Sequence, residues 1–363
     1  MHIPFCESRC SYCDFVSFTE FSHLDRYFDC LCRELAMWSE SLNKPVVDTV
    51  YIGGGTPSDV PTEYLGRLFA VIEKDFKLIN PEITMEVNPK AWQFSELRTL
   101  GVNRLSIGLQ AADDNVLKAV NRRHTFVDFQ RTYEKACNHF ENINIDFILG
   151  LPRETDKTIL NDLKVLETYK PKHVSVYILE IDTEKNANFK IDEDLTAIHH
   201  EIFLSELEKM GYVRYEISNF SLPGYRCRHN LKYWHNENYI GVGVSAGGHV
   251  GTKRYVNTSN LSEYFEKIER GNNPFEYFRE NTIYEELRET LFMGLRLCEG
   301  VELEKLERLK PEIDFTSLVE RFPMQLILEN GRLRMSKLGM DFSHMLFSEI
   351  LGENILSGVT GGE

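Results

Sequence analysis

Three closely spaced cysteines near the start of the chain limit most strongly what it can bind and how it can fold. Cys6, Cys10 and Cys13 follow a short apolar stretch with the spacing Cys-x3-Cys-x2-Cys. In a loop, thiolates at this spacing can ligate three of the four irons of an iron–sulfur cube. The fourth iron would stay open to a small molecule that carries an amine and a carboxylate. The alternatives are a zinc site, which would need a fourth protein ligand, and a purely structural cysteine cluster.

Length and composition narrow the class of protein. With 363 residues the chain is long enough for one large domain and one or two small ones. A net charge of −15 argues against general binding to nucleic acid or anionic membranes, because phosphates would be repelled. Eight cysteines are few for this length and fit a reducing compartment better than a disulfide framework. Without a spanning apolar segment or a signal-peptide pattern, the expected location is the cytoplasm.

The hydrophobic pattern of the first half predicts strands that alternate with amphipathic helices. The expected strands span residues 2–5, 46–52, 83–87, 104–108, 143–149 and 173–179. Helical spacing of apolar residues is found at 23–41, 61–76, 127–140 and 156–169. Repeated βα units favour a parallel sheet. We therefore expect an α/β fold in which residues 1–182 form a partial (βα)6 barrel with its chemistry at the carboxyl ends of the strands.

After residue 182 strands and helices no longer alternate regularly, which predicts further domains. Residues 183–280 are expected to form an α/β extension with a helix over 195–210 and a strand over 212–217. Residues 281–352 are expected to form a small winged-helix-like domain, because helical stretches precede a hairpin signal at Asn330-Gly331. Acidic residues outnumber basic ones there, so a packing or docking role is favoured over DNA binding. The tail, 353–363, is expected to be flexible.

A glycine run and a short basic cluster are candidate ligand-binding segments. Gly53-Gly54-Gly55-Thr56-Pro57 stands between an expected strand and an expected helix. Its backbone can approach a ligand closely, or it simply makes a tight turn, and it is not a Walker or dinucleotide motif. Residues 121–124, Asn-Arg-Arg-His, form a short basic cluster in which one of the two arginines could hold a carboxylate by its planar fork. The alternative for this cluster is a solvated helix end.

Three polar residues stand near the carboxyl ends of expected strands. Glu86 and Gln110 each end such a strand, and Asp146 falls inside an apolar run. The active sites of such barrels lie at the carboxyl ends of the strands. Glu86 could instead be an ordinary acid at the end of a strand. A buried carboxylate is costly unless it is paired, so Asp146 should have either a structural donor or a ligand as its partner.

A second stretch rich in potential ligands spans residues 227–235, Cys-Arg-His-Asn-Leu-Lys-Tyr-Trp-His. Imidazole and thiolate are common axial ligands of haem iron, and aromatic side chains suit a flat apolar ring. The cysteine and the two histidines of this stretch, Cys227, His229 and His235, could each serve as such a ligand. The alternative is that they serve only the structure.

Together these motifs resemble one family. HIPFC-x3-C-x-YC-x-F, YIGGGTPS, EVNP, GVNRLSIGLQ, NIDFILGLP and HNxxYW are similar to those of the oxygen-independent coproporphyrinogen III oxidase-like branch of radical S-adenosylmethionine (SAM) proteins, and within it the haem chaperones. The resemblance implies that Cys6, Cys10 and Cys13 hold a [4Fe–4S] cluster and that His229 is a candidate haem ligand. The residues it implies around SAM are Gly54, Gly55, Thr56, Glu86, Gln110, Arg122 and Asp146.

The resemblance also implies a function. We expect a protein that binds haem and delivers it to haem-dependent proteins, among them membrane-bound respiratory subunits, with a homodimer left open. The alternatives are radical decarboxylation of coproporphyrinogen III and radical methylation that degrades haem. Phe15 stands where the oxidases carry a fourth cysteine, as it does in the chaperones, and this lowers the expectation of decarboxylation.

A second departure concerns SAM. The family carries a tyrosine two residues before the histidine of HIPFC, and the printed chain starts one residue too late to include it. The expectation is that the start is truncated or mis-assigned, or that SAM binding is compromised.

Overall fold

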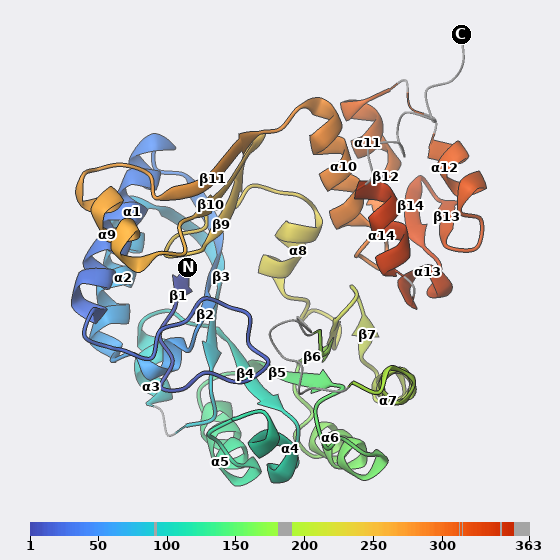
Figure 1. The fold of residues 1–363 in the computed structure, drawn as a ribbon, viewed down its shortest axis with the longest axis horizontal. Helices are drawn as coiled ribbons and strands as arrows, with labels where there is room; N and C mark the ends of the chain where they lie inside the picture. Colours follow the sequence, from blue (N-terminus) through green and yellow to red (C-terminus); the bar gives the residue numbers. More distant parts are fainter. Residues whose placement is uncertain (91–92, 181–190, 312, 314, 342, 352–363) are drawn as a thin grey trace.

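An eight-stranded sheet forms the centre of the fold (Figure 1). The computed structural model describes residues 1–351 except 91–92, 181–190, 312, 314 and 342. The strand order is β1-β2-β3-β4-β5-β6-β8-β7, and the first six strands run parallel. These six are β1 (His2–Ile3), β2 (Val46–Gly54), β3 (Lys77–Val87), β4 (Arg104–Gln110), β5 (Asn142–Leu149) and β6 (His173–Ile178). Among the described residues the two end strands, β1 and β7, do not pair with each other, so the sheet stays open, and the expected partial (βα)6 barrel is confirmed.

Alternation along the strands separates an apolar layer from a polar interior. In β5, Ile143, Ile145 and Phe147 are buried in the core, whereas Asn144 and Asp146 point to the opposite face. The helices on the apolar side are α1 (Leu24–Ser41), α2 (Thr62–Asp75), α3 (Phe94–Thr99), α4 (Asp114–Ala119), α5 (Phe126–Cys137) and α6 (Asp156–Tyr169). A polar face at the interior leaves the donors and acceptors of the strands available to a ligand.

The extension adds an antiparallel edge to this sheet and a second sheet beside it. After α7 (Glu193–Lys209), β7 (Val213–Arg214) and β8 (Asn219–Ser221) pair antiparallel, and β8 also pairs with β6. The single strand expected over 212–217 is therefore wrong, because the chain turns between two short strands. A three-stranded sheet in the order β11-β10-β9 was not expected from the sequence. Its strands are β9 (Gly247–Val250), β10 (Lys253–Asn257) and β11 (Phe275–Glu280), with α8 (Arg228–Trp234) before them and α9 (Leu261–Glu269) between β10 and β11.

The last part of the chain has a hydrophobic core of its own. It contains α10 (Ile283–Gly294), β12 (Val301–Glu302), α11 (Leu303–Leu309), α12 (Phe315–Arg321), β13 (Leu326–Glu329), β14 (Arg332–Met335), α13 (Lys337–Asp341) and α14 (Ser343–Leu351). Leu287, Leu291, Leu306 and Leu333 lie at the centre of this core. Asn330 and Gly331 make the turn of the hairpin with positive φ angles, as the sequence indicated. The expected boundaries at 182 and 280 remain a prediction, and the expected tail lies outside the described residues.

Among the helices of the described part of the chain, none is long and apolar enough to cross a membrane.

One buried carboxylate ties the first helix to the extension. Glu34 on α1 accepts hydrogen bonds from the Gly243 amide (2.8 Å), the Asn257 amide (2.6 Å) and the Tyr264 hydroxyl (2.7 Å). The side chain is 1% exposed, and burial raises its pKa to about 7. These bonds hold α1 against a loop, β10 and α9 at once, so the extension is fastened to the barrel by a polar contact inside an apolar layer.

The raised pKa of Glu34 predicts a pH-dependent contribution to stability. The folded protein binds this proton more tightly than the unfolded chain, so the contribution is full below a pH of about 4.5 and is lost as the pH rises through about 7. Its size is on the order of 3 kcal/mol. We expect the free energy of unfolding of the wild type, minus that of Glu34→Gln, to fall between pH 5 and pH 8. Urea unfolding across this range measures it, and parallel pH profiles of the two proteins would contradict it.

Candidate functional site

The cysteine loop begins where β1 ends and folds back on itself. The Cys6 amide donates to the Phe18 carbonyl (3.0 Å), and the Cys13 amide donates to the Cys10 carbonyl (3.2 Å). The Asn121 side chain donates to the Arg9 carbonyl at 2.7 Å and so fastens the loop to the barrel. Cys6 is buried, whereas Cys10 and Cys13 are partly exposed. The loop therefore holds its three thiols at the carboxyl edge of the parallel sheet.

A chain of hydrogen bonds connects two of the cysteines to the ends of the strands. The Cys6 sulfur lies 3.3 Å from the Thr56 hydroxyl, which also accepts from the Asn88 amide at 3.0 Å. The Asn88 oxygen accepts from the Arg122 guanidinium at 2.9 Å, and the same guanidinium donates to the Cys10 sulfur at 3.6 Å. Thr56, Arg122 and two of the cysteines, named separately from the sequence, are thus brought together, and Asn88 joins them.

The chemistry of the thiols fits an iron–sulfur cluster. Burial raises the pKa of Cys6 and Cys13, so bound metal is needed to hold them as thiolates. Within the described residues, the metal-ligating atoms that gather within 4.8 Å of one another belong to His249, Glu286 and Glu289. The three cysteine sulfur atoms do not meet that spacing, and the case for a cluster rests on their number, their sequence spacing and the thiolate preference of such clusters. The Arg122 guanidinium beside Cys10 supplies a positive charge next to the ligands.

The glycine loop and Glu86 form a cradle for a cation. The Glu86 carboxylate accepts from the Gly54 amide (3.0 Å) and the Tyr51 hydroxyl (2.9 Å). A Cβ on Gly53 would lie 2.6 Å from this carboxylate, so only glycine allows the approach. The Gly55 amide donates to the Ile3 carbonyl, which holds the loop against β1. Burial raises the pKa of Glu86, and an ammonium group bound there would compensate the charge.

Gln110 and Asp146 occupy two different environments in the interior. Gln110 ends β4 with a φ of +72°, a left-handed conformation that is costly for a residue other than glycine. Its side-chain oxygen is buried and has no hydrogen-bond partner among the described residues. Asp146 accepts from the Ser106 hydroxyl (3.0 Å) and the Asn144 amide (2.7 Å), and burial raises its pKa. The partner that Asp146 requires is thus supplied by the protein, whereas Gln110 keeps a free acceptor.

These groups suit a ligand with both an amine and a carboxylate. Glu86 and the free oxygen of Gln110 accept hydrogen bonds, and the buried Nε of Arg122 has no partner among the described residues. A bound ammonium would donate to the oxygens of Glu86 and Gln110, and a bound carboxylate would accept from Arg122. The residues present therefore fit a cluster together with SAM.

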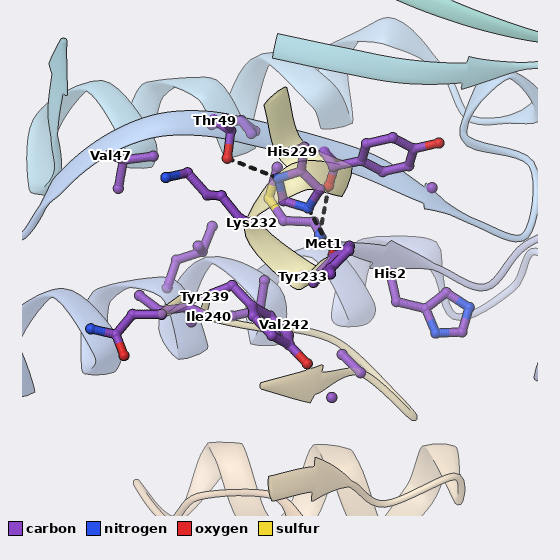
Figure 2. Close-up of a pocket in the computed structure, with 18 of the residues that line it drawn as sticks. Met1, His2, Val47, Thr49, His229, Lys232, Tyr233, Tyr239, Ile240 and Val242 are labelled. Atoms are coloured by element: carbon purple, nitrogen blue, oxygen red, sulfur yellow. Dashed lines mark hydrogen bonds between the residues drawn. The ribbon is translucent and has the colours of Figure 1, made fainter. Parts of the chain in front are cut away.

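His229 lies apart from the cysteines, at the start of α8. Its Nδ1 is 2.9 Å from the Thr49 hydroxyl, and its Nε2 is 2.7 Å from the Tyr233 hydroxyl (Figure 2). The ring stacks on Tyr51 with centroids 5.2 Å apart. The amides of Arg228 and His229 donate to buried Glu82, which fixes the beginning of the helix. Burial lowers the pKa of His229 to about 3, so the imidazole is neutral at ordinary pH.

A cavity of about 630 Å³ lies beside His229, between β2 and the segment that follows α8 (Figure 2). Its size is typical of a ligand pocket, and its wall is largely apolar. The residues that matter for the argument are Phe15, Val47, Val50, Ile240, Val242 and His229. Phe15 is 66% exposed although it is a large apolar residue. The only imidazole on the wall besides His229, within the part the structure describes, is that of His2.

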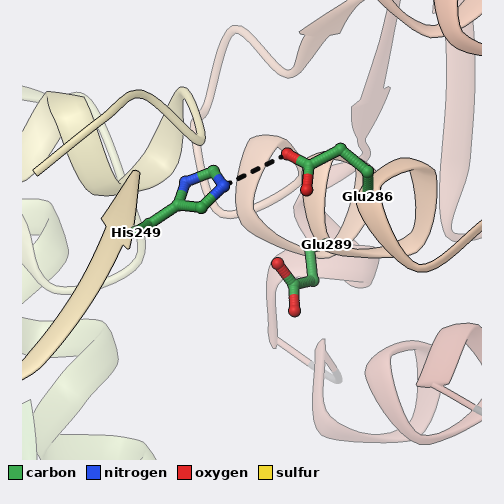
Figure 3. A group of neighbouring side chains, drawn as sticks. All are labelled: His249, Glu286 and Glu289. Atoms are coloured by element: carbon green, nitrogen blue, oxygen red, sulfur yellow. Dashed lines mark ion pairs between the residues drawn. The ribbon is translucent and has the colours of Figure 1, made fainter. Parts of the chain in front are cut away.

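A second cluster, His249 with Glu286 and Glu289, joins β9 to α10 (Figure 3). His249 Nε2 lies 3.4 Å from Glu286. Glu289 is paired with Arg254 at 2.7 Å and with Arg279 at 3.0 Å. The positive charges of two guanidinium groups at these distances would repel a metal cation. The cluster is therefore an ion-pair network that connects the extension to the last domain.

Sequence reasoning missed three residues of the two sites, Tyr51, Asn88 and Thr49, whereas Tyr233 belongs to the stretch 227–235 that it singled out. A signal for two of them was present. Asn88 follows Glu86 by two positions, and Tyr51 precedes Gly53 by two, so each shares a strand face with a residue that was named. The contact of Thr49 with His229 joins residues 180 positions apart, and no local pattern indicates it.

Comparison with known proteins places the chain in a family. The model of the Radical SAM superfamily matches residues 1–166. "Heme chaperone HemW" of Bacillus subtilis is 32% identical, over 99% of this chain and 98% of the relative. "Heme chaperone HemW" of Lactococcus lactis is 33% identical, over 98% of this chain and 97% of the relative.

The fold has a counterpart among solved structures. Coproporphyrinogen III oxidase (HemN) from Escherichia coli, described as a radical SAM enzyme, superposes with a TM-score of 0.83 over 99% of this chain and 89% of that chain. At 20% identity this similarity concerns the fold alone. The identities over nearly the whole length carry the assignment: the chain belongs to the HemW family of the radical SAM superfamily.

Proposed function

We propose that this protein binds haem and delivers it to haem-dependent proteins, with a [4Fe–4S] cluster and SAM bound in its barrel. The acceptors include membrane-bound respiratory subunits, and the protein works in the cytoplasm. The names of its relatives support the haem part of the proposal. The observation that carries it is His229, a neutral imidazole on the wall of an apolar cavity.

In this proposal Cys6, Cys10 and Cys13 are the cluster ligands. When bound, the cluster supplies an open iron and an electron for SAM chemistry. Glu86 accepts from the amine of SAM, and Arg122 holds its carboxylate while also stabilising the Cys10 thiolate. Gly54, Gly55 and Thr56 form the wall on one side, and Gln110 and Asp146 form it on the other.

Haem binding at His229 follows from the state of its ring. Thr49 can accept the Nδ1 proton, which leaves the Nε2 lone pair on the side of Tyr233. The Tyr233 hydroxyl occupies that lone pair in this structure, so iron must displace it. The apolar wall suits the face of a porphyrin. Lys232 also lines the cavity, but its ammonium is paired with Asp48 and Glu237, each at 3.0 Å, so a propionate would have to displace one of these carboxylates.

Two features favour delivery over turnover of the porphyrin. Phe15 lines the cavity and stands in place of a fourth cysteine. His229 offers one protein ligand, which leaves iron accessible to an acceptor. The direct test is to mix haem-loaded protein with haem-free apomyoglobin and follow the Soret band. Transfer with full recovery of intact haem is the expected result. Consumption of haem or of coproporphyrinogen III with SAM and reductant would favour the enzymatic alternatives instead.

The cluster ligands are tested by metal content. Oxygen-protected wild type should contain about four irons per chain and an equal amount of sulfide. Cys10→Ser should lose most of both, because a cube held by two thiolates is weakly bound. Cys137→Ser, which removes an exposed cysteine on α5, is the matched control and should keep them. Zinc in place of iron in the wild type would refute the cluster.

The role of Glu86 is tested by SAM binding. Glu86→Gln keeps the shape of the side chain and removes its charge. Losing a charged hydrogen bond of about 1.5–3 kcal/mol should weaken SAM binding by roughly 10- to 100-fold. Isothermal titration of cluster-loaded protein measures this. Unchanged SAM affinity in Glu86→Gln would remove Glu86 from the site.

His229 is tested by titration with hemin. His229→Ala should shift the Soret band and weaken haem binding by about tenfold or more, because an iron ligand is lost. His235→Ala, at the end of the same helix, is the control and should leave both unchanged.

The same titration tests the lowered pKa of His229. An ordinary histidine is largely protonated below a pH of about 6.5 and then competes poorly for iron. Since burial lowers the pKa of His229 to about 3, haem affinity should stay level between pH 7.5 and 5.5. A loss of affinity centred near pH 6.5 would contradict the assignment of this ligand.

A further inference from the structure

We propose that Tyr51 couples the two sites, so that SAM binding in the barrel tightens haem binding at His229. This inference rests on the proposed function, since it needs both ligands. It adds a linkage between them and assigns that linkage to one side chain.

Tyr51 contacts a key residue of each site. Its hydroxyl donates to Glu86 Oε1 at 2.9 Å, and its ring stacks on the His229 imidazole at 5.2 Å and an interplanar angle of 25°. The Tyr51 side chain is partly buried and also lines the cavity beside His229. One rigid ring therefore separates the carboxylate that would hold the SAM amine from the candidate haem ligand.

Strand β2 makes this contact stiff. Thr49, Tyr51 and Gly53 alternate along β2 and share one face. Thr49 contacts His229, Tyr51 contacts His229 and Glu86, and Gly53 packs against Glu86. Thr49 and Tyr51 pair in register with β3, the strand that also carries Glu86. The sheet thus fixes the backbone of Tyr51 relative to both sites, and the side chain is held only by its contacts with Glu86 and His229.

The direction of the effect follows from charge. Without SAM, the Glu86 carboxylate lies in a low-polarity setting, where burial raises its pKa. The SAM ammonium would favour the ionised form, and a hydroxyl donates a stronger hydrogen bond to an ionised carboxylate than to a neutral acid. Tyr51 would then be held more firmly, and with it the ring of His229. An imidazole that is already held in its binding orientation loses less conformational freedom when haem binds, so the affinity for haem rises.

Because the binding of SAM and the binding of haem are thermodynamically linked, the coupling can be measured by titrating either ligand. Couplings between sites commonly change affinity by about 5- to 150-fold, and each ligand changes the affinity of the other by the same factor. We expect SAM to tighten hemin binding by roughly fivefold or more. Hemin should tighten SAM binding by the same factor.

The experiment is a hemin titration of cluster-loaded protein, with and without saturating SAM, in three proteins. The wild type should show the fivefold ratio of affinities, and Tyr51→Phe should show a ratio near one. Tyr264→Phe is the matched control, because it also removes a buried hydrogen bond from tyrosine to glutamate, at 2.7 Å from Glu34 and outside both sites. It should keep the ratio of the wild type.

The outcomes separate this inference from the proposed function. A ratio of one in the wild type, or an undiminished ratio in Tyr51→Phe, with both ligands still bound, overturns the linkage alone. Absence of hemin binding in all three proteins overturns the proposed function, and the linkage with it. If Tyr51→Phe does not fold, Glu86→Gln replaces it, with SAM raised to saturation. This variant lacks the charge that strengthens the Tyr51 hydrogen bond, so its ratio should also fall to one.

Discussion

The pairing of the Glu86 carboxylate is the interaction on which the rest of the site depends. A carboxylate in this position is costly unless donors surround it, and the protein supplies a backbone amide from the glycine loop and the hydroxyl of Tyr51. Those two bonds hold the glycine loop and the tyrosine close to β3, and the tyrosine ring stacks on His229 of α8. The need to pair the Glu86 carboxylate thus shapes the proposed SAM pocket and, through Tyr51, connects it to His229.

The late segments of the chain complete the site that the early segments begin. α8 contacts both β2 and α10, and its first amides are satisfied by Glu82 on β3. Because a helix begins with unpaired amides, a buried acid is an effective anchor for it. The ion pairs of Glu289 with Arg254 and Arg279 then join the extension to the last domain. In Figure 1, α8 accordingly lies between the barrel and the C-terminal helices.

Much of the barrel could be predicted from the sequence, because its strands and helices are specified by patterns among neighbouring residues. Strands such as β5 alternate apolar and polar residues, and helices such as α5 show helical spacing with a capping threonine, Thr125. The sheet β9–β11 was missed because β9 is short and includes glycines at 247 and 248, and because β11 pairs with β10 only after the intervening helix α9. The turn between β7 and β8 was missed for a related reason: Glu216 and Asn219 bond to each other there, and this polar contact breaks the strand.

The sequence by itself determined which residues are candidates for the proposed chemistry. Cysteine spacing, the glycine run and the strand-end acids are encoded within a few neighbouring positions, and residues of one face recur every second place along a strand. Only the tertiary structure decided which of these groups meet. The chain of contacts from Cys6 through Thr56 and Asn88 to Arg122, and the contact of Thr49 with His229, join positions far apart in the chain. Such contacts depend on the packing of whole strands and helices, which no short stretch of sequence specifies.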